Sequence, residues 1–127
     1  MTPRLIDLDA DYPILCDWWQ SHAWPSPPQR FLTPLGWIIP DRCAAFLYHV
    51  PESKLAGVEW WVTNPQNTPM QSMRSLAALS QHISQEARSR GIEALFTSCS
   101  QPSLGRLFQA VGFQATDQHV SHFIQPL

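Results

Sequence analysis

The stretch Leu55–Thr63, with the sequence LAGVEWWVT, decides how this chain of 127 residues folds. Its apolar, aromatic and β-branched residues predict a strand, in which Glu59 is the only carboxylate. Two further apolar runs precede it, at residues 36–40 and 42–50, and the turn residues Pro40-Asp41 separate them. We therefore expect three consecutive strands that form an antiparallel meander.

A long helix is expected after the meander. Apolar residues recur at intervals of three or four between residues 73 and 90, which is the period of an amphipathic helix. A buried strand at residues 94–99 and a short helix at 103–111 follow. The last residues, 113–115 and 119–124, predict a terminal hairpin.

The N-terminal part adds a strand, a helix and a stiff arm. Residues 4–8 alternate polar and apolar side chains, and a helix is expected to begin at Asp9 or Asp11, with Pro13 in its first turn. Residues 22–35 are rich in proline, which excludes regular structure but keeps the backbone stiff, as in an ordered arm or lid. This order of elements predicts one α/β domain, residues 1–127, with helices on both faces of a mixed, mostly antiparallel sheet.

The composition excludes several classes of protein. Charged residues make up 14%, and the net charge is −2 with no basic block, which argues against a general nucleic-acid binder. No apolar run approaches the roughly 20 residues of a membrane span. The three cysteines are too widely spaced for a disulfide framework or a metal pair, so we expect core residues in a reducing, cytoplasmic compartment. No group of His, Cys and Asp has the spacing of metal ligands.

Three stretches give this order of elements a family resemblance. Residues 56–61 (AGVEWW), 86–91 (EARSRG) and 107–113 (LFQAVGF) resemble three segments of the GCN5-related N-acetyltransferase (GNAT) superfamily. These segments are the strand that holds the pantetheine arm of acetyl-CoA, the end of the cofactor helix, and a helix-to-strand junction that ends in Gly-Phe. The resemblance implies a single-domain GNAT fold.

A narrower group is also similar, namely small GNAT-like proteins of phage and prophage genomes. The shared features are an early Trp-Trp pair, a proline arm followed by Leu-Gly, a strand ending in Thr-Asn-Pro, and a helix starting with Pro-Ser-Leu. Here they are Trp18-Trp19, residues 25–34 with Leu35-Gly36, residues 63–65 and residues 102–104. The likeness extends over residues 4 to 125 and would place the protein in the cytoplasm of a host cell.

The resemblance implies transfer of an acetyl group from acetyl-CoA to an amine by direct attack, with no metal. The backbone of three strand residues would hold pantetheine: Trp61, Val62 and Thr63. The start of the long helix would hold the diphosphate through Gln71, Ser72, Arg74 and Ser75. Gln101 stands where many members carry an Asn that contacts the cofactor.

Two departures from the family pattern bear on this function. GNAT enzymes place small residues in the turn before the long helix, so that backbone N–H groups can approach the diphosphate. Counted back from Gly91, Arg74 and Leu76 occupy those positions. Phe108 stands where many members carry the Tyr that protonates the departing thiolate.

Among the candidate catalytic residues, Glu59 is the expected general base, because partial burial of its carboxyl would raise its pKa towards the working range. The alternative is a strand carboxylate that faces solvent or pairs with an arginine. Trp24 and Trp60 could frame an acceptor pocket, or fill the core and a seam under the arm. His22 begins the arm and is either a proton-transfer group or a surface or capping residue.

A non-enzymatic role is the alternative function. On this interpretation the chain is an inactive GNAT-fold scaffold that binds a protein partner through its Trp- and Pro-rich arm, residues 22–35. The altered turn and the loss of the tyrosine favour it. The exposed aromatic residues that we expect would also suit a homodimer. The acceptor amine would be a small molecule or a protein.

Overall fold

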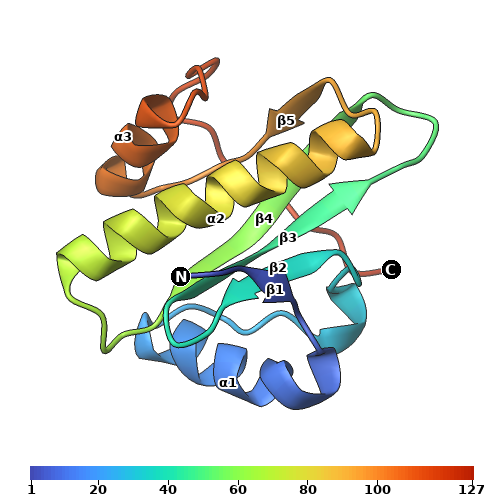
Figure 1. Cartoon of the computed structure of the whole chain (residues 1–127). Helices are drawn as coiled ribbons and strands as arrows, with labels where there is room; N and C mark the ends of the chain where they lie inside the picture. The colour runs from blue at the N-terminus through green and yellow to red at the C-terminus, as the bar shows by residue number, and fades with distance from the viewer.

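The computed structural model describes residues 1–127 as a five-stranded sheet with helices on both faces (Figure 1). The strands lie in the order of the chain: β1 (Arg4–Leu5), β2 (Gly36–Ile39), β3 (Cys43–His49), β4 (Leu55–Thr63) and β5 (Ala94–Phe96). Neighbours are antiparallel except β4 and β5, which are parallel. The predicted meander and the mixed α/β sheet are therefore confirmed.

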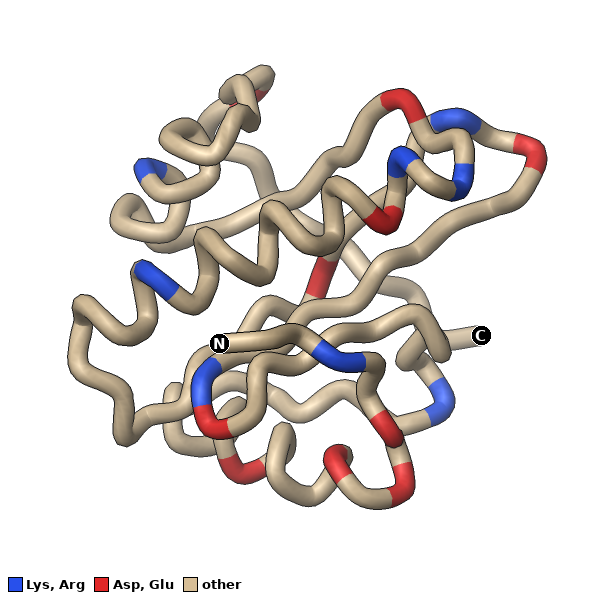
Figure 2. The backbone as a smooth tube through the Cα atoms, in the orientation of Figure 1, with Lys and Arg blue, Asp and Glu red and all other residues tan.

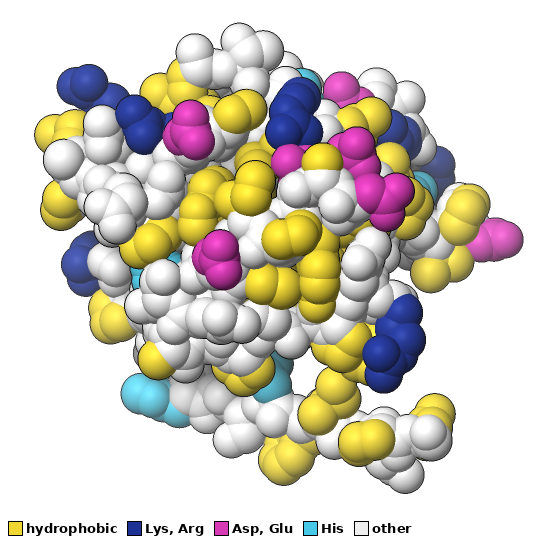
Figure 3. Space-filling view, turned by 90° about the horizontal axis from the view of Figure 1, so that it is seen from below, with side chains coloured by type: hydrophobic (Ala, Val, Ile, Leu, Met, Phe, Trp, Pro, Cys, Tyr) yellow, Lys and Arg dark blue, Asp and Glu magenta, His cyan; other side chains and the backbone are white.

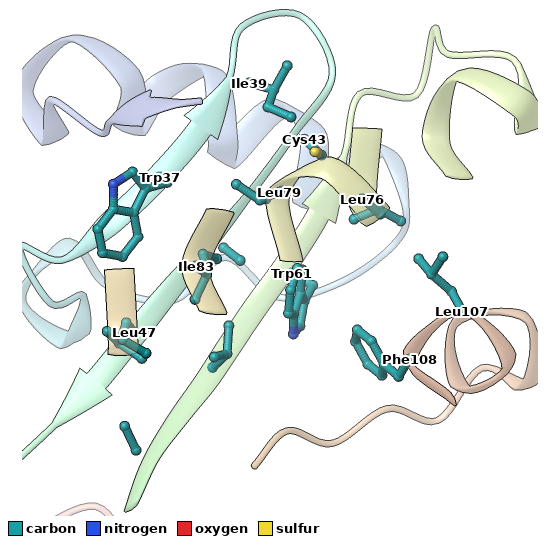
Figure 4. Close-up of a cluster of buried hydrophobic side chains, with 14 of the residues drawn as sticks. Trp37, Ile39, Cys43, Leu47, Trp61, Leu76, Leu79, Ile83, Leu107 and Phe108 are labelled. Atoms are coloured by element: carbon teal, nitrogen blue, oxygen red, sulfur yellow. The ribbon is translucent and has the colours of Figure 1, made fainter. Parts of the chain in front are cut away.

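Three helices cover the sheet, and each face has its own core. α1 (Leu8–Ser21) packs its Leu15, Trp18 and Trp19 on one face, against Phe46 and Val62. On the other face, α2 (Pro69–Ser89) and α3 (Pro102–Ala110) bury a larger cluster over Trp37, Leu47 and Trp61 (Figure 4). Apolar side chains at alternate positions of a strand thus pack into two cores, one on each face of the sheet. None of the three helices is both long and apolar enough to cross a membrane.

The start of α1 differs from the prediction. Asp7 is the N-cap and accepts a hydrogen bond from the N–H of Asp9, so the helix begins earlier than expected and β1 is shorter. Asp11 lies inside the helix and is buried, where it pairs with both terminal nitrogens of Arg4 at 2.8 and 2.9 Å. Its carboxylate therefore holds β1 against α1, and it also accepts a hydrogen bond from the backbone N–H of the N-cap residue Asp7 at 2.8 Å.

The proline-rich arm, residues 22–35, is fixed by hydrogen bonds to two tyrosines. Tyr12 donates to the carbonyl oxygen of Pro27 at 2.9 Å, and Tyr48 donates to that of Phe31 at 2.7 Å. A single 3₁₀ turn, η1 (Gln29–Phe31), is its only regular element. The arm runs beside α1 and returns the chain to β2.

The C-terminal part departs from the expectation of a terminal hairpin. Residues 113–127 contain no strand. Phe113 packs partly against Phe108, but the large hydrophobic side chains after it stay exposed, with Phe123 at 93%. β5 offers only three residues at the edge of the sheet, which leaves a hairpin little to pair with. Cys99 is exposed as well, so the prediction that all three cysteines are core residues is wrong for it, whereas Cys43 is fully buried.

Candidate active site

β4 contains a β-bulge at its tryptophan pair. The pairing with β3 shifts by one residue, so that Trp60 and Trp61 together lie opposite Ala45. Trp60 takes up the extra residue with a φ of 61°, an unusual value for a residue with a bulky side chain. Because the strand gains a residue here, the side chains of Glu59 and Trp60 lie on the face of the sheet that carries α1.

The side chains next to the bulge point to two different faces of the sheet. Glu59 pairs with Phe46 of the α1-side core, and the indole N–H of Trp60 donates to Tyr48 Oη at 2.9 Å, on that same side. Trp61 instead packs into the α2-side core, 5.1 Å from the ring of Phe108 (Figure 4). The two adjacent tryptophans therefore face opposite sides of the sheet.

β4 and β5 separate beyond Gly57, where their parallel pairing ends. Thr97 closes the junction: its hydroxyl donates to the carbonyl oxygen of Val58 at 2.6 Å and accepts from the indole N–H of Trp61 at 2.9 Å. From Val58 to Thr63, no strand pairs with the outer edge of β4. This unpaired edge forms one wall of a cleft.

The cleft has a volume of about 270 Å³ and lies between the end of β4 and the starts of α2 and α3. Six of the residues expected from the sequence line it: Trp24, Trp61, Val62, Thr63, Ser72 and Gln101. The remaining lining residues are His22, Pro69, Met73, Leu76, Ser103, Leu104 and Leu107. The cleft thus joins residues from the arm, the strand and both helices.

The beginning of the arm covers one side of the cleft. His22 is the C-cap of α1, and its Nε2 lies 3.0 Å from the carbonyl oxygen of Thr63 and 3.2 Å from the hydroxyl. Because a carbonyl oxygen can only accept, Nε2 carries the proton. The ring of Trp24 stacks on that of His22, with 4.7 Å between centroids. His22 therefore caps a helix and also pins the arm to β4.

The start of α2 lies four residues earlier than the sequence interpretation placed it. Thr68 and Gln71 form a capping box: the Gln71 N–H donates to Thr68 Oγ1, and the Thr68 N–H donates to Gln71 Oε1. Arg74 is therefore in the second turn of the helix and exposed. Ser75 is fully buried, and its hydroxyl donates to the carbonyl oxygen of Gln71 at 2.7 Å. Of the four residues expected to hold the diphosphate, only Ser72 lines the cleft.

The start of α3 is arranged differently. Gln101 is the N-cap, but its side chain makes no capping hydrogen bond, and Pro102 follows. The backbone N–H groups of Ser103 and Leu104 have no hydrogen-bond partner in the protein. These two residues line the cleft together with Gln101. The sequence analysis expected Gln101 at the donor site, and Gln101 lines the cleft, but the free backbone donors of Ser103 and Leu104 beside it were missed.

Glu59 lies outside the cleft, on the opposite face of β4. Its carboxyl is half-buried, and burial raises its pKa, while the hydroxyl of Ser98 and the charge of His122 act in the opposite direction. Ser98 Oγ lies 3.3 and 3.4 Å from the two carboxylate oxygens. Our sequence analysis did not identify Ser98 or His122 as partners of Glu59. No cluster of three or more His, Cys, Asp or Glu residues that could bind a metal is present.

The aromatic residues around Glu59 come from three elements. Trp60 is 37% exposed and is hydrogen-bonded to Tyr48, which in turn holds the arm at Phe31, 47% exposed. This face of the molecule exposes hydrophobic side chains among acidic and basic ones (Figure 3). Phe108, by contrast, is buried in the α2-side core, so its position supplies packing and no proton donor.

Comparisons with known proteins identify the fold. No family model matches the chain, and no curated protein sequence matches it. Several solved structures do match. An acetyltransferase of Trypanosoma brucei has a TM-score of 0.69 and 16% identity, over 97% of this chain and 99% of that one. The ribosomal-protein-S18-alanine N-acetyltransferase of Escherichia coli has a TM-score of 0.72 and 19% identity, over 91% of this chain and 79% of that one. A Mycobacterium tuberculosis protein in complex with CoA also matches (0.72, 16%, 95% and 76%). The chain therefore has the α/β fold of the GNAT acetyltransferases.

Proposed function

We propose that the protein is an acyltransferase that moves an acetyl group from a coenzyme A thioester to an amine. The observation that carries the proposal is the cleft at the separated edges of β4 and β5, with half-buried Glu59 on the opposite face of the same strand. Support comes from the fold, which the chain shares with acetyltransferases and with a protein crystallised with CoA. Because one fold can host many activities, the proposed activity rests on the residues of the site.

The donor would lie in the cleft with its pantetheine arm along the outer edge of β4. The backbone of Trp61, Val62 and Thr63 and the side chain of Gln101 are the polar partners that we assign to it. Ser72 adds a hydroxyl from α2. The thioester would then point towards the junction with β5, where Thr97 joins Val58 and Trp61.

The acceptor would approach from the α1 side of the sheet. Glu59 would take a proton from the ammonium group. Because the pKa of Glu59 is raised, it lies nearer to that of the ammonium group, which favours the proton transfer. The exposed ring of Trp60 would attract the cationic amine before it loses that proton. Trp24 lines the donor cleft, so of the two tryptophans expected to bind the acceptor only Trp60 is assigned to it.

The reaction balances as a direct transfer. The neutral amine nitrogen attacks the thioester carbonyl carbon, a C–N bond forms and the C–S bond breaks. Glu59 keeps the proton from nitrogen until solvent removes it, and a backbone N–H at the bulge would stabilise the oxyanion. The sulfur leaves as a thiolate, whose conjugate thiol has a pKa of roughly 8.5 like that of cysteine, and it takes up, through water, the second proton that the nitrogen loses as the amide forms. Buried Phe108 has no part in this step.

Two secondary assignments belong to the same proposal. All three cysteines are free, which suits the cytoplasm, that of a host cell if the chain is phage-encoded. The acceptor is a small molecule or a protein amine, and the hydrophobic side chains on the α1 face would also allow a homodimer.

The test is acetyl transfer with thiol release as the readout, measured with acetyl-CoA and a panel of primary amines. Glu59→Gln should lower kcat by about 10²–10⁴-fold, the usual contribution of a general base, without weakening donor binding. Glu93→Gln is the matched control, because Glu93 is exposed at the turn before β5. Equal activity of Glu59→Gln and wild type would refute the role of Glu59. Absence of both transfer and donor binding would refute the proposed function.

A further inference from the structure

The cleft is lined by no lysine or arginine side chain, and most of the lining is apolar. The basic residues of α2 lie elsewhere: Arg74 is exposed outside the cleft, and Arg88 and Arg90 lie at the far end of the helix, where charges of both signs gather (Figure 2). A ligand bound in this cleft would meet few groups able to neutralise a diphosphate.

The start of α2 cannot compensate with its backbone. Pro69, its first residue, has no N–H. The N–H groups of Gln71 and Ser72 already donate to the side chain and the carbonyl oxygen of Thr68. The free backbone N–H groups of a helix start usually bind anions, and at the start of α2 only that of Met70 remains free. The capping box thus occupies the place where a diphosphate would bind.

The volume of the cleft also favours a slender ligand. About 270 Å³ is just below the range of pockets that hold drug-sized molecules, roughly 300–1,000 Å³. A linear chain with two amide groups would fill it, and a chain together with a nucleotide would not. The free N–H groups of Ser103 and Leu104 and the side-chain amide of Gln101 are suited to amide carbonyl and N–H groups.

We infer that the cleft recognises its acyl donor through the acyl-pantetheine arm alone, so that the nucleotide portion of coenzyme A adds little to binding. The substrate class is therefore an acyl-pantetheine thioester. This inference rests on the proposed function and narrows it. The transfer step is unchanged: the C–S bond to pantetheine breaks, and the arm leaves as a thiol.

The experiment is a calorimetric titration of the wild-type protein with three compounds. S-acetyl-pantetheine and acetyl-CoA should bind with Kd values within about threefold of each other, and ADP should give no heat at millimolar concentration. Acetyl-CoA binding more than about 30-fold tighter than S-acetyl-pantetheine would overturn the inference. Binding of neither thioester would instead refute the proposed function, so the two failures are distinguishable.

Two variants sharpen the same titration. Gln101→Ala should weaken both thioesters by the same factor, about fivefold, as expected for one lost hydrogen bond. Arg74→Ala should leave the affinity for acetyl-CoA unchanged, because Arg74 lies outside the cleft. A loss of acetyl-CoA affinity in Arg74→Ala, with S-acetyl-pantetheine unaffected, would show that the nucleotide is recognised and would overturn the inference.

Discussion

The starts of α2 and α3 border the same cleft, but α3 leaves two backbone N–H groups free and α2 leaves only one. Both helices begin with a proline, which has no N–H, but at α2 Thr68 and Gln71 also satisfy each other's N–H groups. At α3, Gln101 makes no capping hydrogen bond, and the N–H groups of the next two non-proline residues have no partner. A helix start is thus available to a ligand only where its own cap leaves it open.

This difference changes how the fold would be used. A helix whose side chains cap its own N-terminus gains stability. A helix without such caps keeps the backbone N–H groups of its first turn free to donate to a bound molecule. The cleft therefore offers more free backbone donors at its α3 end than at its α2 end, where Ser72 supplies a hydroxyl among apolar residues. We expect ligand binding to depend on the first helix start and folding stability on the second.

The largest effect is expected from blocking the cleft at one helix start and not the other. Ser103→Trp should fill the space beside Gln101 and weaken acetyl-CoA binding by at least roughly 30-fold, or ~2 kcal/mol. Met70→Trp is the matched control, because Met70 occupies the equivalent second position of α2 and is exposed outside the cleft. Calorimetry on both variants checks this. Equal losses in the two variants would remove the distinction between the helix starts.

A smaller effect is expected from removing the α2 cap. Thr68→Ala should destabilise the protein by about 1 kcal/mol, the usual cost of losing a side-chain cap, and lower the melting temperature by roughly 3–5 °C. Thermal unfolding monitored by circular dichroism measures this. Donor affinity should not change. A variant with wild-type stability but weaker donor binding would show that Thr68 serves the ligand.

Glu59, on the opposite face of β4, should make the stability of the protein depend on pH. Because burial raises the folded-state pKa of Glu59, the folded protein holds this proton more tightly than the unfolded chain. The stabilisation is complete below the unfolded value of roughly 4.3 and is lost as pH rises through the folded value. Glu59→Gln should therefore be more stable than wild type at pH 8 and lose that advantage at pH 4. Urea unfolding at both values tests it; a less stable variant at pH 8 would contradict the assigned burial.

The smallest effect concerns His122. Its positive charge lowers the pKa of Glu59, against the larger effect of burial. His122→Gln removes that charge, so the acid limb of the pH–rate profile should move to higher pH. The affinity for acetyl-CoA should stay the same, since His122 is not part of the cleft. A limb that moves to lower pH would show that the tail does not act on Glu59 as described.

Much of the fold could be predicted from periodicity, because the meander and α2 each expose a clear pattern of apolar residues. The bulge could not, since nothing in the composition of LAGVEWWVT indicates that Trp60 adopts a positive φ. The start of α2 was predictable: Thr68 and Gln71 have the spacing of a capping box, and proline is common at the first helical position. Reading Pro69 as a loop residue displaced the helix by one turn.

The candidate site was predictable only in part, for a physical reason. Residues on β4 follow from strand alternation, and Glu59 stands out as the one carboxylate there. Contacts between distant segments do not follow from local pattern. His22 reaches Thr63, and Ser98 reaches Glu59, only because the sheet brings their elements together. The predicted hairpin failed for the same reason, because residues 113–127 find no long edge to pair with.

The most direct measurement is a titration of ¹⁵N-labelled protein with acetyl-CoA, followed by NMR of assigned backbone amides. The largest shifts are expected on Ser103 and Leu104 and on the end of β4 at Thr63. The amides of Met70 and Gln71 should move little, because the capping box keeps that helix start closed. Largest shifts at Met70 and Gln71, with Ser103 and Leu104 unaffected, would contradict the account.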